Sequence, residues 1–314
     1  MRLRRDSESG FALVIVIWGL LLVAVLATAF SVAMRTYTQA TANLVENARA
    51  AAYADAGVAI AVAALLDRRK TNSGWRGRLR LDGMPLGCSI GSEARLEIAV
   101  QDEAGRIDIN FADERLLVAL FQSAGASQGE SQAYVDRLVD FRDGDNLRRA
   151  AGAELAEYRS AGLTYGPKNS EFSSIDELEQ VLGVPTDLFR SVRPYITVHS
   201  RLPGIDVSVA PRPLLRALAG DGLDGSDSVD RGQAPPVSQL RPDLSLLTTL
   251  GVRSSGRIFS IVAIASTAGG ARFVREAVVE LTDQQQAPFQ FKTWQRGDAP
   301  REQPLAGADP LPRC

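Results

Sequence analysis

The chain begins with an abrupt change from polar to apolar positions. Charged side chains stop shortly before Gly10, and residues 11–34 contain none. As a helix this run is long enough to cross a hydrocarbon core of about 30 Å. From Arg35 onward, apolar residues recur at helical spacing as far as about Asp67. The pattern therefore predicts one helix from about Phe11 to about Asp67. Its first half spans a membrane, and its second half packs on a globular head.

Strict alternation of apolar and polar residues predicts two groups of strands after the helix. The first group has Asp82–Gly83 as a hairpin turn between its first two members, which are expected to pair with each other. Its predicted strands are Trp75–Leu81, Leu86–Ile90 and Arg95–Gln101. The second group is a meander whose predicted strands are Arg257–Ser266, Ala271–Leu281 and Phe289–Trp294. Both groups together predict a small antiparallel sheet.

Residues 112–196 show helical periodicity instead. The predicted helices are Asp113–Phe121, Glu130–Phe141, Ser174–Leu182 and Thr186–Tyr195. Ser174 and Glu177 have the spacing of a capping box, and Gly183 and Pro185 follow the helix that they start. A helical block of this size can hold its own core. The predicted fold class is therefore α+β, with an all-α domain inserted between the two groups of strands.

Two segments of the chain repeat one pattern. Arg106–Leu120 and Gly204–Leu218 both read Ile-Asp, then Ala, then a Leu-Leu-x-Ala-Leu helix. A polar residue precedes each helix, Asn110 in the first and Ser208 in the second, and we expect it to accept from early helical N–H groups. We interpret the repeat as a reused connection from strand to helix.

Charge and composition argue against several classes of function. The net charge of −2 provides no overall basic field that would attract nucleic acid. Two cysteines and one histidine are too few for a Cys/His zinc site, and they make a histidine-based catalytic triad a poor hypothesis. Cys88 and Cys314 leave two states open: a disulfide in an oxidising compartment, or two free thiols.

Three interpretations of the N-terminus compete: a secretory signal, a plain membrane anchor, and a leader removed between Gly10 and Phe11. The apolar run is too long for a cleavable signal peptide and continues without a break into the polar helix. Arg2, Arg4 and Arg5 favour a cytoplasmic N-terminus. The bulk of the chain then lies on the far side of the membrane, which is the periplasm in a bacterium.

A charged leader that ends in Gly, followed by Phe and a long apolar helix, resembles the N-terminus of type IV pilins and pseudopilins. The resemblance implies that a prepilin peptidase cleaves between Gly10 and Phe11 and methylates the new N-terminus at Phe11. Ile15 stands where that family usually has Glu. Pilins pair this Glu with the N-terminal amine of a neighbouring subunit. A subunit with Ile15 offers no such carboxylate, which suits the end of a filament.

Four motifs narrow the resemblance further. RIDINFADERLL, DRLVDFRDGDN, the GAELAEYRSAGLTYGPKNSEF region and GIDVSVAPRPLLRAL resemble the general secretion pathway protein K family in order and spacing. That family is the large minor pseudopilin of the type II secretion system, and the resemblance covers residues 1 to about 220. Members also lack the Glu, so Ile15 agrees with the family.

The family resemblance implies a function, a location and a set of partners. The expected protein is a non-enzymatic, single-pass inner-membrane subunit at the tip of the periplasmic pseudopilus. There it initiates and caps assembly for protein export across the outer membrane. Its expected partners are minor pseudopilins of the I and J types, the major pseudopilin, prepilin peptidase and the inner-membrane assembly platform, with no nucleic acid.

The residue pattern and the resemblance together predict a domain plan around a pilin-like head, in which the long N-terminal helix packs on a small antiparallel sheet. The expected parts are a leader (1–10), a transmembrane helix (11–34), a discontinuous head (35–104 and 203–294), an inserted helical domain (105–202) and a disordered tail (295–314).

An acidic stretch provides the candidate metal ligands, which are Asp140, Asp143, Asp145, Glu154 and Glu157. Calcium prefers such oxygen ligands, and the family resemblance implies a calcium site in the helical domain. Leu155 and Ala156 stand where the family commonly has an Asp pair, so a site of the family can have been lost here. The other interpretation, and the default, is a solvated acidic loop paired with Arg148 and Arg149.

Other functions have weaker support. The Ile-Asp-x-Asn motif and the hairpin after Leu182 are similar to helix-hairpin-helix modules, which gives a DNA-uptake or type IV pilus minor pilin as the alternative function. The hairpin carries Asp187 and no Lys, which disfavours phosphate binding. Gly220–Gly225 matches G-x-G-x-x-G outside a strand–helix context, which argues against a nucleotide site. We interpret His199 as structural. The hypothesis of a signal-anchored periplasmic hydrolase is disfavoured, because the sequence has no nucleophile and base at a catalytic spacing.

Overall fold

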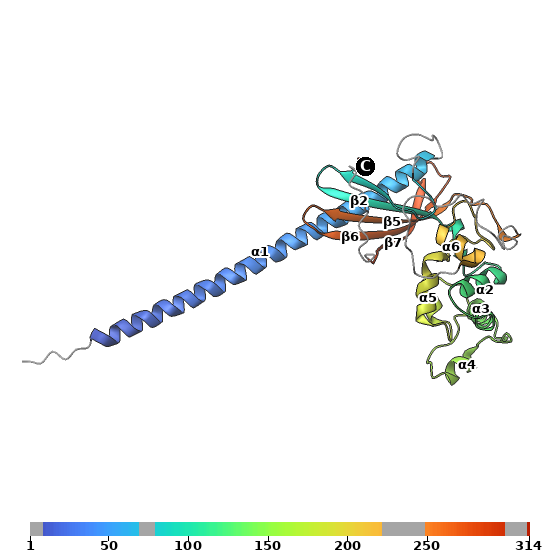
Figure 1. Ribbon diagram of the computed structural model, residues 1–314, viewed down its shortest axis with the longest axis horizontal. Coiled ribbons are helices and arrows are strands. Elements are labelled where there is room, and N and C mark those ends of the chain that lie inside the picture. Colours follow the sequence, from blue (N-terminus) through green and yellow to red (C-terminus); the bar gives the residue numbers. More distant parts are fainter. Residues whose placement is uncertain (1–8, 69–78, 222–248, 299–312) are drawn as a thin grey trace, which may run out of the picture.

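The protein consists of a long helix, a five-stranded sheet and a group of short helices (Figure 1). A computed structural model describes residues 9–68, 79–221, 249–298 and 313–314. Figure 1 shows α1 extending far beyond the sheet on one side, whereas the short helices gather near the opposite end of the sheet. This is the α+β fold that the sequence predicts.

The long helix α1 runs from Ser9 to Arg68, which confirms a single helix through the membrane segment and into the head. Side chains before residue 45 are exposed wherever they are described, and burial begins at Ala50. From there α1 packs with small and branched residues on β2, β5 and β6. A Cβ at Gly57 would lie only 3.0 Å from the Cβ of Ala263, so glycine permits the close approach of helix and sheet.

The sheet has the strand order β1-β2-β5-β6-β7, and every pairing is antiparallel. The strands are β1 (Leu86–Ile90), β2 (Ala94–Asp102), β5 (Ile258–Thr267), β6 (Arg272–Leu281) and β7 (Phe289–Arg296). The late meander is therefore confirmed to within two residues. Its first turn uses Gly270 at φ +85°, and the Thr267 N–H donates to the Ala271 carbonyl at 2.9 Å.

The expected pairing at the start of the sheet is wrong. Leu86–Ile90 pairs with β2, with Leu86 opposite Ile98, and not with residues 75–81. Residues 69–78 lie outside the described part of the chain, and residues 79–81 are not a strand. Instead, Asp82 forms an isolated antiparallel bridge with Gln101, and the Asp102 N–H donates to Leu81 O. Residues 81–83 thus line the far end of β2, on the same side as β1.

The expectation of a disordered tail from residue 295 also needs correction. The β7 ladder continues to Arg296, opposite Arg275. Residues 299–312 lie outside the described part, but Cys314 forms a disulfide with Cys88 across 226 positions. Its N–H donates to Ser89 O at 3.1 Å. This settles the open question of the two thiols, and it ties the last two residues to the outer edge of β1.

The block between the two parts of the sheet is helical, as expected, but its elements differ in detail. They are η2 (Glu103–Gly105), β3 (Ile107–Asp108), α2 (Glu114–Ser123), α3 (Gln128–Arg142), α4 (Leu155–Ser160), η3 (Ile175–Gln180), α5 (Thr186–Val192), η4 (Arg193–Tyr195), β4 (Ile196–Thr197), α6 (Arg212–Arg216) and η5 (Ala217–Asp221). Sequence patterning missed α4, which is only six residues long. The expected helix at residues 174–182 is a 3₁₀ segment.

Helix capping differs from the expectation as well. The Ser174 hydroxyl accepts from the Asp176 N–H, but no capping box with Glu177 forms. The Glu177 carboxylate pairs with Lys168 at 2.8 Å instead. A capping box does lie at the start of α3, where Ser127 and Glu130 each accept from the backbone N–H of the other.

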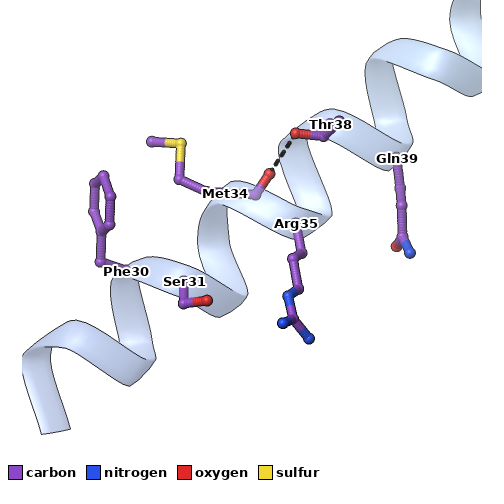
Figure 2. Close-up of a pocket in the computed structure, with 6 residues that line it drawn as sticks. All are labelled: Phe30, Ser31, Met34, Arg35, Thr38 and Gln39. Atoms are coloured by element: carbon purple, nitrogen blue, oxygen red, sulfur yellow. Dashed lines mark hydrogen bonds between the residues drawn. The ribbon is translucent and has the colours of Figure 1, made fainter. Parts of the chain in front are cut away.

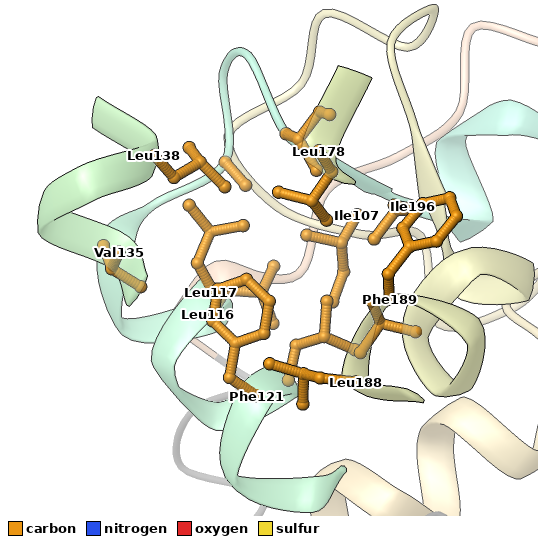
Figure 3. Packing of buried hydrophobic residues seen from close by; sticks show 14 of the residues in the cluster. Ile107, Leu116, Leu117, Phe121, Val135, Leu138, Leu178, Leu188, Phe189 and Ile196 are labelled. Atoms are coloured by element: carbon orange, nitrogen blue, oxygen red, sulfur yellow. The ribbon is translucent and has the colours of Figure 1, made fainter. Parts of the chain in front are cut away.

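The helical block has its own core, separate from that of the head (Figure 3). Leucines and Phe121 of α2 face α3 and α5 there, and Ile107 and Ile196 of the short parallel pair β3–β4 lie beside them. The core extends past residue 202, the expected end of the inserted domain. Its later members are Ile205, Ala210, Leu214, Leu215 and Leu218.

The repeated Ile-Asp pattern makes the same turn twice. Asp108 accepts from the Asn110 N–H at 2.8 Å, and Asp206 accepts from the Ser208 N–H at 2.9 Å. The expectation that Asn110 caps a helix is wrong, because Asp113 caps α2. The Asn110 side chain instead binds both backbone polar groups of Phe172, its N–H and its carbonyl. Its Oδ1 accepts from the N–H at 2.7 Å, and its Nδ2 donates to the carbonyl at 3.0 Å.

We therefore expect Asn110→Ala to destabilise the helical block by about 2–4 kcal/mol. The substitution leaves a buried N–H and a buried carbonyl of Phe172 unpaired, and each such group costs about 1–3 kcal/mol. Urea denaturation of the two proteins measures the change. Gln122→Ala, at an exposed position of α2, is the control and should stay within about 0.5 kcal/mol of wild type. A loss below 1 kcal/mol for Asn110→Ala would contradict this role.

Candidate functional site

The membrane-facing part of α1 carries the first group of candidate residues. Gly10 and Phe11 lie in the first turn of the helix, and Ile15 is 57% exposed. The segment has a mean hydropathy of 2.8 in its most apolar window, none of that window is buried in the protein, and one helix of this length fits a single-pass membrane anchor. This surface must be covered by lipid or by other apolar helices.

The apolar run ends at a clear chemical boundary on α1 (Figure 2). Phe30 and Met34 project to one side, whereas Arg35 and Gln39 project to another. Arg35 is the first charged residue after the apolar run. The Thr38 hydroxyl donates to the Met34 carbonyl at 2.9 Å, so this hydroxyl is satisfied within the helix. The boundary therefore agrees with a membrane segment that ends near residue 34.

The acidic residues of the helical block form the second group. Asp140 is fully buried at the end of α3, and both its oxygens accept from the Arg149 N–H, at 3.2 and 3.3 Å. Glu154 is 7% exposed, and both its carboxylate oxygens are buried without a hydrogen-bond donor. Asp143 Oδ1 is also buried without a donor. These unsatisfied oxygens are costly in a protein interior.

These carboxylates influence one another electrostatically. Burial raises the pKa of Asp140, Asp143 and Glu154, and repulsion from neighbouring carboxylates raises it further. The Asp145 Oδ1 accepts from the Leu147 N–H at 2.7 Å. The pKa of Glu157 is lowered, chiefly because its carboxylate accepts from the Glu154 N–H at 3.0 Å. The arrangement concentrates negative charge that nearby arginines offset only in part.

Only half of the expected arginine pairing is present. Arg148 lies 3.5 Å from Glu157, as the default interpretation requires. The Arg149 guanidinium instead binds Glu114 at 2.7 Å and lies 3.5 Å from Asp136, outside the acidic stretch. The buried position of Asp140 and Glu154 also disagrees with a fully solvated loop. Burial of these side chains is a tertiary effect that the local sequence does not encode.

The candidate carboxylates are not gathered around one common position. Among the described residues, no three His, Cys, Asp or Glu side chains are gathered tightly enough to hold a metal. The donor chemistry nevertheless fits a hard cation, since calcium is bound by oxygen ligands such as carboxylates. Sequence analysis missed one further oxygen there. Asn169 Oδ1 is buried without a donor, while its Nδ2 donates to the Asp145 carbonyl at 3.3 Å.

One glycine lets the backbone approach this site closely. A Cβ at Gly152 would lie 1.9 Å from Asp140 Oδ2. Only glycine therefore allows the backbone at position 152 to approach the carboxylate this closely. The Gly-Ala-Glu segment that contains Gly152 was recognised as a motif, but its contact with Asp140 spans a turn that local patterning does not show.

His199 occupies the junction between the sheet and the helical block. Burial lowers the pKa of its imidazole, and the nearby Glu103 and Asp108 oppose that shift. Glu103 accepts a hydrogen bond from the Thr197 hydroxyl and lies 3.3 Å from Arg106. Asp108 is occupied by the backbone N–H groups of Asn110 and Arg201. These carboxylates are held by structural partners, which supports a structural interpretation of the junction.

A long helix that is apolar at its start and packs at its end on an antiparallel sheet defines a pilin-like fold. Residues 99–201 match the family model described as type II secretion system (T2SS), protein K. The chain therefore contains a region similar to type II secretion system protein K.

Two curated relatives are similar in sequence. The type II secretion system protein K of Pectobacterium carotovorum subsp. carotovorum is 31% identical over 77 residues, 24% of each chain. The putative type II secretion system protein K of Escherichia coli strain K12 is 28% identical over 138 residues. That alignment covers 42% of this chain and 39% of the relative. The similar regions therefore span well under half the length of either relative.

One solved structure matches over most of the chain. It is the GspK-GspI-GspJ complex from the type 2 secretion system of enterotoxigenic Escherichia coli, with a TM-score of 0.57 and 15% sequence identity. The alignment covers 82% of this chain and 99% of the other. At this identity the match establishes the shared fold.

Proposed function

We propose that this protein is the minor pseudopilin at the tip of a type II secretion pseudopilus, where it initiates and caps assembly. The observation that carries the proposal is the combination of Ile15 with a bulky helical block near the end of the sheet away from the exposed part of α1. The helical block is too large to lie inside a thin filament. Without a carboxylate at position 15, no subunit beyond this one gains a partner for its N-terminal amine. Subunits then add only on the membrane side. This role is assembly and not catalysis.

The proposed partners follow from the same role. The matched solved complex contains GspI and GspJ beside GspK, and we propose minor pseudopilins of these two types as direct partners. The major pseudopilin adds below them, prepilin peptidase processes Gly10–Phe11, and the inner-membrane assembly platform supports growth. Mass spectrometry of the mature chain tests the processing step. N-methyl-Phe11 as the first residue is the expected result, and a retained leader in secreting cells would exclude it.

We place the head in the periplasm and the N-terminus in the cytoplasm. The Cys88–Cys314 disulfide supports this orientation, because such bonds persist in oxidising compartments and are rare in the cytosol. The positive residues before Gly10 support it independently.

The disulfide also gives a stability prediction. Reduction should destabilise the head by about 2–4 kcal/mol, because the bond closes a loop of 226 positions in the unfolded chain. Melting curves with and without reductant measure the effect. The Cys314→Ser variant should melt at the reduced wild-type temperature and show no response to reductant. Two freely alkylated thiols in intact secreting cells would contradict the proposed orientation.

We further propose that the acidic residues bind calcium. Glu154, Asp143 and Asp140 would hold the ion, with Asp145, Glu157 and Asn169 as the other candidate oxygens. The buried oxygens of Glu154 and Asp143 that lack donors support this proposal. Burial raises the pKa values of both carboxyls and repulsion raises them further. A bound divalent cation would supply positive charge and offset both effects.

Calcium at about a hundred times its dissociation constant should therefore stabilise the protein by about 2.7 kcal/mol, or raise its Tm by roughly 5–10 °C. Glu154→Gln should abolish this shift. Glu171→Gln, which removes an exposed carboxylate near Arg201, is the matched control and should keep the shift. An unchanged Tm of the wild-type protein in calcium would refute the site.

The direction of the pH effect follows from the raised pKa values. Without calcium, the folded protein holds protons on these carboxyls more tightly than the unfolded chain does. Its stability should rise as the pH falls through the raised pKa values toward about 4, the ordinary carboxyl range. The calcium shift should shrink over the same pH range.

The alternative of a DNA-binding minor pilin stays a hypothesis that no contact favours. In the relevant hairpin, the Asp187 side chain is 93% exposed and pairs with Arg190 at 2.8 Å, and this exposed carboxylate would repel a phosphate. Fluorescence titration with duplex DNA at two salt concentrations distinguishes the two functions.

A further inference from the structure

The end of helix α3 belongs both to the acidic site and to the contacts that hold the helical block together. Asp140 and Asp143, two of the candidate ligands, stand on either side of Phe141 and Arg142 in the sequence. The half-buried Arg142 guanidinium donates to the backbone carbonyl of Ile109, a residue that is 1% exposed and 33 positions earlier in the chain. One side chain therefore connects the acidic site to the residue that follows β3.

The contacts of Ile109 continue toward the sheet. Its N–H donates to the carbonyl of Thr197 on β4 at 2.9 Å. The Thr197 hydroxyl donates in turn to the carboxylate of Glu103, which is buried and directly follows β2. Buried polar groups keep their hydrogen-bond partners because an unpaired group is costly. These bonds therefore form a continuous connection from the end of α3, through Arg142, to the end of the sheet, and we name it the Arg142 link.

The charges around Arg142 determine how a bound cation would act on this link. Three carboxylates attract its guanidinium, namely those of Asp108, Glu114 and Asp143. Only Asp143 among these three is a candidate ligand. A divalent cation on Asp143 would cancel the attraction of that carboxylate and would itself repel the guanidinium. The guanidinium is then left to the Ile109 carbonyl and to Asp108, so ion binding strengthens the contact with Ile109.

The place of the acidic site in the fold gives this coupling a consequence. Figure 1 shows α4, which begins after Glu154, at the end of the helical block that lies away from the sheet. The sheet and the helical block have separate cores. Relative motion of two such parts is the default when few contacts cross between them. The hydrogen bonds at the junction therefore decide how firmly the helical block is held on the sheet.

We infer that a divalent cation in the acidic site strengthens the Arg142 link and thereby fixes the helical block to the end of the sheet. Arg142 is the positioning residue that connects the two. Without the ion, Asp143 competes with the Ile109 carbonyl for the guanidinium, and the junction is looser. The inference rests on the proposed calcium site and adds what its occupation does elsewhere in the protein. Coupling of this kind typically changes an equilibrium by about 5- to 150-fold.

Hydrogen–deuterium exchange of the full-length protein in detergent micelles, with and without calcium chloride, tests the coupling. Two peptides are compared. One contains Arg149, whose N–H binds Asp140 at the acidic site, and the other contains Ile109, whose N–H binds Thr197 at the junction. Because opening of a hydrogen bond limits exchange, we expect calcium to slow exchange at both amides by at least about fivefold. Exchange that slows at Arg149 alone would overturn the inference.

Substitutions of Arg142 separate the link from the site. In Arg142→Met, which removes the donors but keeps an unbranched side chain, calcium should still slow exchange at Arg149 but should change it at Ile109 less than about twofold. Arg142→Lys keeps the charge and one donor, so it should retain most of the slowing at Ile109. Arg190→Met removes an arginine that is 69% exposed in the same block, and this control should behave as wild type. Equal slowing at Ile109 in wild type and Arg142→Met would contradict the link.

The reciprocal effect gives an independent measurement, because coupling between two sites acts in both directions. Thr197→Val breaks the link at its far end by removing the hydroxyl that binds Glu103. It should weaken calcium binding, measured by isothermal titration calorimetry, by at least about fivefold. Thr186→Val makes the same change at an exposed position of α5 and should alter the affinity less than about twofold. An unchanged calcium affinity in Thr197→Val would be incompatible with the coupling.

The two measurements also separate a failure of the calcium site from a failure of the coupling. If the wild-type protein shows neither heat of calcium binding nor slower exchange at Arg149, the proposed calcium site is wrong and the inference fails with it. If calcium binds and slows exchange at Arg149 but leaves Ile109 unchanged, the site stands and only the coupling is wrong.

Discussion

Gly105→Ala should lower the melting temperature of the head by roughly 10 °C. Gly105 lies where the chain leaves β2 for the helical block. A Cβ there would be 2.4 Å from the Val209 carbonyl oxygen and 2.7 Å from Gln101 Nε2. Because Val209 O is a backbone atom and accepts from Gln101 Nε2 at 2.9 Å, the methyl group cannot be accommodated by rotating one side chain.

The expected cost combines two effects. Overpacking typically costs 1–3 kcal/mol, and separating Gln101 from the Val209 carbonyl leaves buried polar groups unpaired at about 1–3 kcal/mol. A total of about 3 kcal/mol or more corresponds to the stated shift, at 2–4 °C per kcal/mol for a domain of this size. Differential scanning calorimetry of the two proteins measures it.

Gly129→Ala is the matched control for this change. Gly129 lies in the first turn of α3, is exposed, and has no atom within 4 Å of the position of a Cβ. The same methyl group should therefore leave the Tm unchanged or raise it slightly, by up to about 1 kcal/mol in free energy. An unchanged Tm for Gly105→Ala would contradict the close contact between residue 105 and the Val209 carbonyl.

Much of this fold follows from local pattern. The long α1 helix and the meander β5–β6–β7 were predicted within a few residues, because a continuous period of 3.6 or 2 leaves one choice of element. The pairing of the first hairpin was predicted wrongly. Both Trp75–Leu81 and Arg95–Gln101 alternate, so either could pair with Leu86–Ile90. The register is decided by burial of Cys88, Leu96 and Ile98 under α1, which local sequence does not contain.

In the candidate sites too, local sequence predicts some features and tertiary packing decides the others. The roles of Gly10, Phe11 and Ile15 could be predicted from sequence because the motif is linear, and they stay predictions. The acidic residues were also named, but their burial was not predicted, since Asp140 and Glu154 are enclosed by packing of α3 against the following loop. The pairing of Arg149 with Glu114 on α2 spans 35 positions and has no local signal. The Cys88–Cys314 bond likewise depends on the fold bringing two ends together.

Ile15→Glu should reduce secretion to a tenth or less of the wild-type level in a strain that depends on this protein. A carboxylate at this depth in the bilayer costs about 2.5–3.5 kcal/mol on insertion scales, a factor of roughly a hundred. At the proposed tip position no subunit lies beyond this one to supply an N-terminal amine as a partner. The variant therefore either carries an unpaired charge at the tip or moves to an internal position, where a neighbouring amine can pair with it but the helical block does not fit.

Pseudopilus length and number, counted by electron microscopy, distinguish this mechanism from a general insertion defect. Ile17→Glu is the matched control, because Ile17 is 54% exposed on the same helix and Ile15 is 57% exposed, yet position 17 has no amine partner anywhere in the proposed stack. Ile17→Glu should simply lower the amount of membrane-inserted protein. Ile15→Glu should insert in the presence of the other subunits but give fewer and misassembled filaments. Unchanged filaments with Ile15→Glu, or equal behaviour of the two variants, would show that a missing carboxylate does not place this subunit at the tip.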